Sequence, residues 1–348
     1  MGKSVSQILD MIRENNIQMV DFKMVDINGQ YRHVTIPAQN FSEETMKSGI
    51  GFDASNYGYA VVEKSDMVFI PDPDTAVIDP FCSIPTLSMT GNAMIIDHPE
   101  NRPLAQYPRN IIKAAVAYMQ ESGVADEMKI LPEFEFYLFD DVTWGVEGNY
   151  IGASVDAKQS YWNSATDGKG VIVPKQKNYH IAKPFDTSYE CRSEMCLHMK
   201  NAGIDINYHH PEVAASGQYE IEPQLGEVVH MADATMMIKY IIHNTALKYG
   251  KSATFMPKPI YGEAGSGMHV HMILFKDGVP VFSDDSGYSH LSETAHYFMG
   301  GILKHIASLC AITNPSTNSF KRLVPGFEAP VTVGYATSNR SAVIRIPA

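Results

Sequence analysis

The sequence predicts an α+β protein with two domains. Short stretches rich in β-branched and aromatic residues, such as 19–25 and 31–36, are interspersed with longer stretches whose apolar residues recur at helical spacing, such as 5–16. The length of 348 residues is enough for two ordinary domains with sizeable cores. The best boundary candidate is the polar, proline-containing segment 101–108, so we expect an N-terminal domain over 1–103 and a second domain over 104–348.

The first hundred residues predict a small α+β unit. Asn28-Gly29 lies between the first two strands and is a strong hairpin signal. Ser42 is of a type that caps the start of a helix, here expected over 41–47, whereas the Gly- and aromatic-rich segment 49–59 predicts a loop. Further short strands are expected at 67–70, 76–78 and 92–97.

In the second region, Pro108 predicts the start of a helix over 108–120, because proline is well tolerated in a first helical turn. Apolar residues at helical spacing, among them Ile111 and Tyr118, are expected to form its buried stripe. Segment 144–184 is rich in Gly, Asn, Ser and Lys and predicts an exposed excursion. We expect helices at 188–201, 231–249 and 294–309 and strands at 130–140, 218–222, 253–256, 268–275 and 338–348.

Composition narrows the class of protein. The net charge is −12 and no run of Lys or Arg occurs, which argues against nucleic acid as a partner. No apolar run approaches the about 20 residues of a membrane span, and the N-terminus lacks the pattern of a signal peptide. The four cysteines form no CxxC pair, as is typical of reduced thiols. We therefore expect a cytoplasmic protein without a membrane or nucleic-acid partner.

Two carboxylates stand out in the predicted strand over 130–140. Glu133 and Glu135 point to the same face of this strand, because side chains alternate with a period of two. Buried like charges are costly, so a divalent cation beside them is a simple hypothesis. The alternative is a half-solvated strand with two surface glutamates.

Further candidate ligands occur on later strands. Glu212 and Glu220 flank the small-residue turn 214–217, which can fold them together, and His269 and His271 share one strand face. Carboxylates with one imidazole suit Mg²⁺ or Mn²⁺ better than Zn²⁺. Taken singly, each glutamate could be a surface residue and His269 a hydrogen-bonded core residue.

Three C-terminal arginines are candidates for binding anionic groups. Arg322, Arg340 and Arg345 could each be a surface residue, yet the guanidinium fork suits phosphate and carboxylate. Cations and arginines around one site are the pattern of phosphoryl transfer, in which charge neutralisation and positioning dominate.

Many motifs of the chain together resemble type I glutamine synthetases, in the order of that family and over nearly the whole length. The matching segments are HVTIP (33–37), FDASN (52–56), SDMVFIPDPDTAVIDPF (65–81), PEFEFYLFDD (132–141), RSEMC (192–196), HHPEVAASGQYEIE (209–222), KYIIHNTA (239–246), GKSATFMPKPIYG (250–262), GSGMHVHM (265–272), NPSTNSFKRLVPGFEAPV (314–331) and NRSAVIRIP (339–347).

The resemblance implies an N-terminal β-grasp domain and a catalytic domain built on a curved antiparallel sheet flanked by helices. It implies a homo-oligomer of two stacked hexameric rings, with active sites between neighbouring subunits. The implied reaction is the ATP-dependent ligation of ammonia to L-glutamate through γ-glutamyl phosphate, with two or three Mg²⁺ or Mn²⁺ ions at each site.

The resemblance also implies residue roles. Glu135, Glu212 and Glu220 correspond to the ligands of one metal, and Glu133 and His269 to ligands of the metal that faces ATP.

The remaining roles concern substrates and catalysis. Gly265 and Arg322 correspond to glutamate contacts, and His271 to a contact of the nucleotide phosphates. Arg340 and Arg345 correspond to the arginines on the transferring phosphate and ATP. Glu328 corresponds to the flap residue that closes the site and helps deprotonate ammonium, and Asp53 to a loop aspartate that a neighbouring subunit contributes.

The chain also departs from the family pattern. Ala264 stands where the family usually has Asn, Ala54-Ser55-Asn56 replaces a Gly-Ser-Ser run, and Ile273 stands where Ser is common. The family pattern continues beyond Ala348 with a further glutamate ligand, another glutamate-binding arginine and a helical tail, so we expect an incomplete site here. These departures keep three alternatives open: a ligase for larger amines, a non-catalytic ATP-binding paralogue or fragment, and, more remotely, a metallohydrolase.

Overall fold

The computed structural model describes residues 2–165 and 170–347, and segment 166–169 of the predicted excursion lies outside them. The chain divides into two compact units, Met1–Val124 with Val228–Met237, and Ala125–Glu227 with Ile238–Ala348. The predicted domain boundary after residue 103 stays a prediction.

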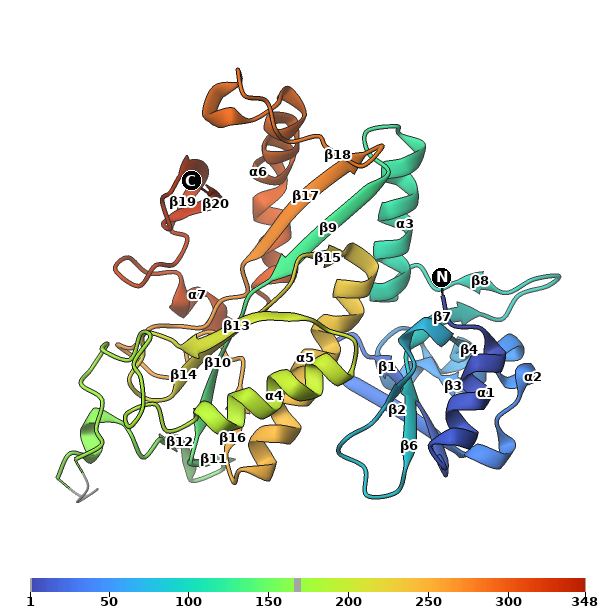
Figure 1. The fold of residues 1–348 in the computed structure, drawn as a ribbon, viewed down its shortest axis with the longest axis horizontal. Coiled ribbons are helices and arrows are strands. Elements are labelled where there is room, and N and C mark those ends of the chain that lie inside the picture. Colours follow the sequence, from blue (N-terminus) through green and yellow to red (C-terminus); the bar gives the residue numbers. More distant parts are fainter. Residues whose placement is uncertain (1, 166–169, 348) are drawn as a thin grey trace. The chain divides into compact units, whose positions relative to one another are not determined.

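The first unit contains two sheets and three complete helices among its described residues. One sheet has the order β2-β1-β6-β5, with β1 antiparallel to β2 and parallel to β6, and the other has the antiparallel order β3-β4-β7-β8 (Figure 1). The strands are β1 (Met19–Val25), β2 (Tyr31–Pro37), β3 (Ile50–Asp53), β4 (Asp66–Pro71), β5 (Val77–Ile78), β6 (Thr86–Met89), β7 (Gly91–Ile95) and β8 (Arg102–Pro103). The helices are α1 (Val5–Glu14), α2 (Glu43–Ser48) and α3 (Pro108–Glu121).

Local signals set these boundaries. The β1–β2 hairpin turns at Asn28-Gly29 as predicted, with Gly29 at φ 76°. The Ser42 side chain caps α2 by accepting from the Thr45 amide, which confirms that prediction. The loop predicted at 49–59 is wrong in part, because its first residues form β3 against β4.

The buried stripe predicted for α3 is wrong. Ile111 is 53% and Tyr118 74% exposed, while Arg109 and Asn110 are buried. Arg109 forms ion pairs with Asp72 and Asp233, at 2.6 and 3.0 Å. Polar contacts of the first helical turn therefore hold α3 in this unit.

The second unit is built on two antiparallel four-stranded sheets, β13-β14-β10-β16 and β15-β9-β17-β18. Its strands are β9 (Glu127–Pro132), β10 (Phe134–Phe139), β11 (Asp141–Glu147), β12 (Tyr150–Asp156), β13 (Ile206–Pro211), β14 (Gln218–Pro223), β15 (Gly226–Glu227), β16 (Ser252–Thr254), β17 (Val270–Lys276), β18 (Val279–Pro280), β19 (Thr332–Thr337) and β20 (Ala342–Ile346). Its helices are α4 (Tyr189–Asn201), α6 (Glu293–Thr313) and α7 (Thr317–Arg322), and α5 (Val228–Lys248) belongs to both units.

The strand predicted over 130–140 is in fact two strands. β9 runs into β10 (Figure 1), but Pro132 pairs with Val270 in one sheet and Phe134 pairs with Ile221 in the other. Glu133 lies at this change of sheet, and its amide donates to the His269 carbonyl at 2.8 Å. The change of partner strand therefore places a candidate ligand where the two sheets join.

Part of the predicted excursion is a regular hairpin. β11 and β12 pair over seven residues each, from Asp141↔Asp156 to Glu147↔Tyr150. Trp144 and Ile151 on this hairpin are 76% and 80% exposed.

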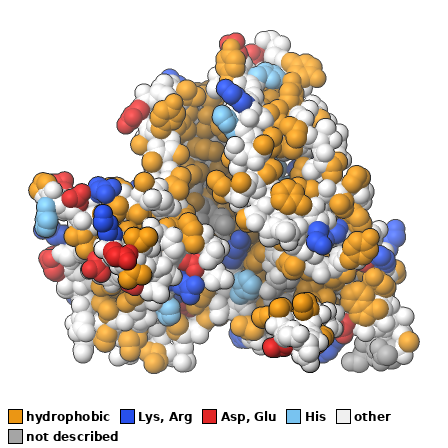
Figure 2. Space-filling view, turned by 180° about the vertical axis from the view of Figure 1, so that it is seen from behind, with side chains coloured by type: hydrophobic (Ala, Val, Ile, Leu, Met, Phe, Trp, Pro, Cys, Tyr) orange, Lys and Arg blue, Asp and Glu red, His pale blue; other side chains and the backbone are white. Residues whose placement is uncertain are grey.

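The distribution of charged side chains on the surface agrees with the absence of Lys and Arg runs in the sequence. On the face drawn in Figure 2, the Lys and Arg side chains of the described residues lie among acidic and hydrophobic side chains rather than in one patch. Within the described part of the chain, no helix combines the length and apolar character needed to cross a membrane.

Candidate active site

Strand register brings the four predicted carboxylates toward one region of the second unit. Glu135 on β10 pairs directly with Glu220 on β14, and Glu220 also pairs with His210 on β13. Glu212 follows the end of β13, and its amide donates to the Gln218 carbonyl at 2.8 Å across the turn. The predicted folding together of Glu212 and Glu220 is therefore confirmed.

Two imidazoles hold Glu133. His269 Nδ1 lies 2.9 Å from one oxygen of this carboxylate and His271 Nε2 lies 2.6 Å from the other. Burial alone would raise the pKa of Glu133, but the hydrogen bonds from His269 and His271 outweigh it and lower the pKa. The hydrogen bond to Glu133 in turn raises the pKa of His271. Glu133 is thus an ionised carboxylate with two nitrogen partners.

Glu135 is tied to the glycine-rich turn. The Gly267 amide donates to Glu135 Oε2 at 3.0 Å, and His269 Nδ1 lies 3.7 Å from Glu135 Oε1. His269 therefore lies between Glu133 and Glu135, as a residue shared by two neighbouring cation sites would.

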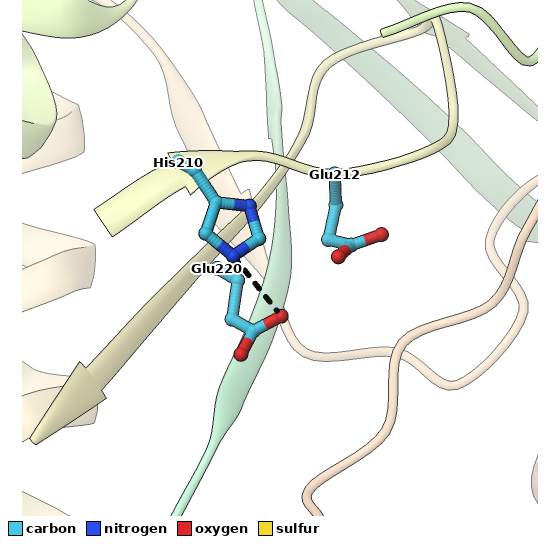
Figure 3. Close-up of side chains that lie close together, drawn as sticks. All are labelled: His210, Glu212 and Glu220. Carbon is cyan, nitrogen blue, oxygen red and sulfur yellow. Dashed lines mark ion pairs between the residues drawn. The ribbon is translucent and has the colours of Figure 1, made fainter. Parts of the chain in front are cut away.

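Glu212 and Glu220 lie close to other carboxylates, among them Glu135. Figure 3 shows their carboxylates and the His210 ring turned toward a common space, and one ligand atom from each lies within 4.8 Å of the others. Burial and the charge of Glu135 raise the pKa values of both Glu212 and Glu220. Such buried like charges are what a divalent cation would neutralise.

His210 is oriented as an additional donor. Its Nδ1 lies 3.0 Å from the Pro211 carbonyl, which can only accept, so Nδ1 carries the proton in the neutral ring. Nε2 then presents its lone pair toward Glu220, 3.7 Å away. Metal-binding histidines commonly have this arrangement.

A second group of acidic ligand atoms lies close by. Glu133, Glu220 and Glu222 are all buried, and one oxygen of each lies within 4.8 Å of the others. The Tyr208 hydroxyl and the Asn207 amide donate to Glu222. Together with His210 and Glu212, these glutamates offer mainly oxygen atoms and one nitrogen as metal ligands, a set that fits Mg²⁺ or Mn²⁺.

A cavity of about 1280 Å³ opens beside these groups within the second unit. Its lining includes Glu135 and, from distant parts of the sequence, most of the other predicted site residues. These are His269, His271, Arg322, Glu328, Arg340 and Arg345. A space lined by carboxylates, imidazoles and arginines can receive an anionic substrate next to cations.

Close approach explains the glycines of the turn at 265–267. A Cβ at Gly267 would lie 2.3 Å from Arg322 Nη2, and one at Gly265 would lie 2.4 Å from the Pro257 carbonyl oxygen. The buried Tyr137 hydroxyl donates to the carbonyl of Ala264. These contacts seat the Arg322 guanidinium directly against the turn.

Asp53 belongs to the first unit. Its carboxylate accepts from the Ser55 amide at 2.9 Å and from the Asn56 side chain at 2.7 Å. Hydrogen bonds from Ser55 lower its pKa. Its predicted role at a neighbouring subunit's site stays a prediction.

Sequence reasoning missed three residues of this region. His210 could have been found, because it lies two residues before Glu212 and so shares its strand face. Glu222 has the same spacing from Glu220. Tyr179 comes from an irregular segment without such a signal; burial and then the charge of Glu212 raise its pKa.

Comparison with known proteins decides the family. The sequence pattern of "Glutamine synthetase, catalytic domain" matches residues 105–348, and that of "Glutamine synthetase, beta-Grasp domain" matches residues 16–95. The chain belongs to the glutamine synthetase family. Membership confirms the predicted β-grasp domain followed by a catalytic domain, and it makes the chain a member of a ligase family associated with glutamine biosynthesis, ATP and metal ions.

Similar proteins within the glutamine synthetase family carry different names. The chain is 43% identical over 349 residues to glutamine synthetase of Vibrio cholerae, covering 99% of this chain and 74% of that one. It is 44% identical over 352 residues to a 3-hydroxylaminophenol mutase of Cupriavidus pinatubonensis, covering 100% and 74%.

Solved structures give the same family. A Plasmodium falciparum glutamine synthetase superposes with a TM-score of 0.88 at 28% identity, covering 99% of this chain and 68% of that one. The protein GmaS without ligand gives 0.78 at 26%, covering 97% and 72%.

Proposed function

We propose that this chain ligates ammonia to the γ-carboxylate of L-glutamate with ATP as the energy source. The observation that carries this proposal is the convergence of Glu135, His269, Arg322 and Arg340 on one cavity, next to clustered carboxylates whose pKa values are raised by burial and by one another. Family membership supports the same chemistry.

The proposed cation ligands form two sets. Glu135, Glu212 and Glu220 would hold one Mg²⁺ or Mn²⁺ ion, and Glu133 with His269 would hold another. When bound, these ions supply positive charge that neutralises phosphate oxygens. His210 is a further proposed donor to the first set, supported by the orientation of its Nε2.

The proposed glutamate site lies at the turn 265–267. Arg322 would pair with a carboxylate of the amino acid through its guanidinium fork, and the backbone of Gly265 would contact it. The tight packing of Arg322 against Gly267 supports this role, because it leaves the guanidinium little freedom to turn away.

The proposed reaction has two steps. A γ-carboxylate oxygen of glutamate attacks the terminal phosphorus of ATP and ADP leaves, while Arg340 and Arg345 pair with phosphate oxygens and His271 contacts the nucleotide phosphates. Ammonium first loses a proton to Glu328 while Asp53 stabilises the cation. The ammonia formed attacks the acyl carbon, the bond from this carbon to the phosphate oxygen breaks, and the phosphate leaves with the proton that the nitrogen sheds. Splitting one hard displacement in this way lowers each barrier.

The decisive experiment measures glutamine formation and phosphate release by the purified chain with ATP, L-glutamate, Mn²⁺ or Mg²⁺, and ammonia. We expect stoichiometric glutamine and phosphate, both lost in Glu212→Gln. Glu147→Gln, an exposed residue of the β11–β12 hairpin, is the matched control. Metal-dependent ATP binding without phosphate release would instead identify a non-catalytic ATP-binding protein.

A ligase for larger amines is the second candidate. Ala264 favours it, because its methyl group offers no hydrogen bond to an amino-acid backbone, and so does the altered 54–56 segment. The same assay with methylamine and ethylamine separates the candidates. If the chain turns over the alkylamines but not ammonia, an amine rather than ammonia is the second substrate of the proposed reaction.

We also propose an assembly into two stacked hexameric rings and a cytoplasmic location. The exposed apolar side chains of the β11–β12 hairpin support contact with other copies, since Trp144, Val146 and Ile151 are 76%, 70% and 80% exposed. Light scattering after size-exclusion chromatography gives the mass; a monomer at micromolar concentration would contradict the assembly.

A further inference from the structure

Lys258 contacts three segments near the glycine-rich turn 265–267, where the proposed glutamate site lies. It is 7% exposed and lies in the loop between β16 and β17. Its ammonium group donates to the Glu263 carbonyl, at the base of the glycine-rich turn. Its amide donates to Asn318 Oδ1 at 2.7 Å, and Asn318 Nδ2 donates back to the Lys258 carbonyl at 3.0 Å, which fixes the backbone against α7.

The third segment is reached through an aromatic ring. The Lys258 ammonium lies 3.9 Å from the centroid of the Phe327 ring, a distance at which a cation is attracted by the ring face. Because Lys258 is only 7% exposed, little water reaches this pair to weaken the attraction. Phe327 also packs against a small core cluster that includes Tyr137 and Ala264.

Phe327 precedes a residue whose backbone needs support. Glu328 has φ 55°, a left-handed conformation that is unfavourable for a residue with a side chain. Such a conformation persists when neighbouring contacts fix it. Ala329 on its other side is 3% exposed, so Glu328 projects into the cavity lining from between two anchored residues.

The charge of Lys258 links its contact with Phe327 to the proposed glutamate site. Burial lowers the pKa of Lys258, and the nearby Arg322 lowers it further, so the two cations repel each other. A substrate carboxylate against Arg322 would offset that repulsion. Occupancy of the glutamate site would then strengthen the hold of Lys258 on Phe327.

We propose that Lys258 is a positioning residue that holds the Glu328 segment (residues 324–330) in place through the Phe327 ring, and so sets the affinity for the amine substrate. This inference rests on the proposed function, in which Glu328 handles the proton of ammonium. It assigns a role to a lysine that touches no reacting atom.

The test compares Lys258→Met, which keeps the aliphatic stem, with Phe327→Leu, which keeps an apolar side chain but removes the ring. Each is expected to raise the KM for ammonia about tenfold and to change the KM for ATP by less than about twofold. The double variant is expected to be no worse than either single variant, because both remove one contact. Phe327→Tyr keeps the ring face and is expected to retain the original KM for ammonia.

Hydrogen exchange gives a readout that needs no turnover. Amides of the Glu328 segment are expected to exchange faster in Lys258→Met and Phe327→Leu than in the parent chain, while those of β10 and β14 stay unchanged. Multiplying effects in the double variant, or unchanged exchange in both single variants, would overturn the proposal. If the parent chain forms no amide product but the exchange pattern is found, the positioning role stands and the proposed function fails.

Discussion

Glu135 and Glu220 lie directly opposite each other on neighbouring antiparallel strands. Like charges in that position repel and destabilise a sheet. The nearby Glu212 adds to the raised pKa of Glu220. A divalent cation among these oxygens would convert the repulsion into attraction, so the stability of this region and its capacity to bind metal are linked.

Removing one of these charges should therefore stabilise the metal-free protein. We expect Glu220→Gln to gain about 0.5–1 kcal/mol in free energy of unfolding without metal, because Gln is neutral at every pH and avoids the cost of protonating a carboxylate beside Glu135. The variant should also lose the increase in melting temperature that Mn²⁺ gives the parent chain. Thermal unfolding with and without Mn²⁺ measures both. Glu121→Gln at the exposed end of α3 is the control, and an equal gain there would contradict the prediction.

Metal binding should release protons near neutral pH. Burial and the charge of Glu135 raise the pKa values of Glu212 and Glu220, so the metal-free fold holds protons that free carboxylates have lost. Calorimetry of Mn²⁺ binding in two buffers of different ionisation enthalpy measures the release, which should fall as the pH rises. No difference between the buffers at neutral pH would contradict this.

The same raised pKa values predict how the stability of the metal-free protein changes with pH. Because the folded pKa values are raised, the folded metal-free protein binds more protons than the unfolded chain above the ordinary carboxyl value of 4.5. The contribution of these groups to stability is thus present below that value and decreases as the pH rises toward the raised values. Urea unfolding of the metal-free chain should show this decrease, and Glu220→Gln should reduce it.

Arg192 should be far more sensitive to substitution than an exposed charged residue of the second unit. It is 1% exposed, pairs with Asp186 through two hydrogen bonds of 2.9 and 2.6 Å, and lies 4.4 Å from the centroid of the Tyr219 ring. We expect Arg192→Met to cost about 3–5 kcal/mol, because it leaves a buried carboxylate unpaired. Lys183→Met, which removes the exposed pair with Glu190, should cost less than about 1 kcal/mol. Urea unfolding separates them, and similar losses would refute the distinction.

Tyr137 should matter for the glycine-rich turn. Tyr137→Phe leaves the Ala264 carbonyl without its buried donor, so we expect a loss of about 1–3 kcal/mol and a higher KM for glutamate. Tyr118→Phe on the exposed face of α3 is the control. An unchanged KM for glutamate would show that this hydrogen bond does not position the turn.

Local sequence signals predicted the regular elements well. The cap at Ser42, the helix start at Pro108 and the turn at Asn28-Gly29 depend on neighbours within a few residues, and the structure has all three. The break at Glu133 was not predictable in this way, because it depends on which strands pair with β9 and β10. The exposure of Ile111 was missed for a similar reason, since periodicity does not say whether a helix face has a partner.

The residues of the candidate site likewise differ in whether local sequence patterns could predict them. Glu133, Glu135, Glu212 and Glu220 were predictable because strand alternation and a short turn bring them together. The partnership of Lys258 with Phe327 joins residues far apart in sequence and carries no periodic signal. Contacts of that kind arise only from the tertiary fold.

The placement of Glu133 at the change of sheets has a consequence for how the protein matures. Its carboxylate meets His269 and His271 through the pairing of β9 with β17, whereas Glu135 meets Glu220 through the pairing of β10 with β14, so the full set of ligands needs both sheets in register. A chain with one sheet out of register would present no such pocket for a cation. We therefore expect the affinity for a divalent cation during refolding to rise only after the two sheets have both formed in register.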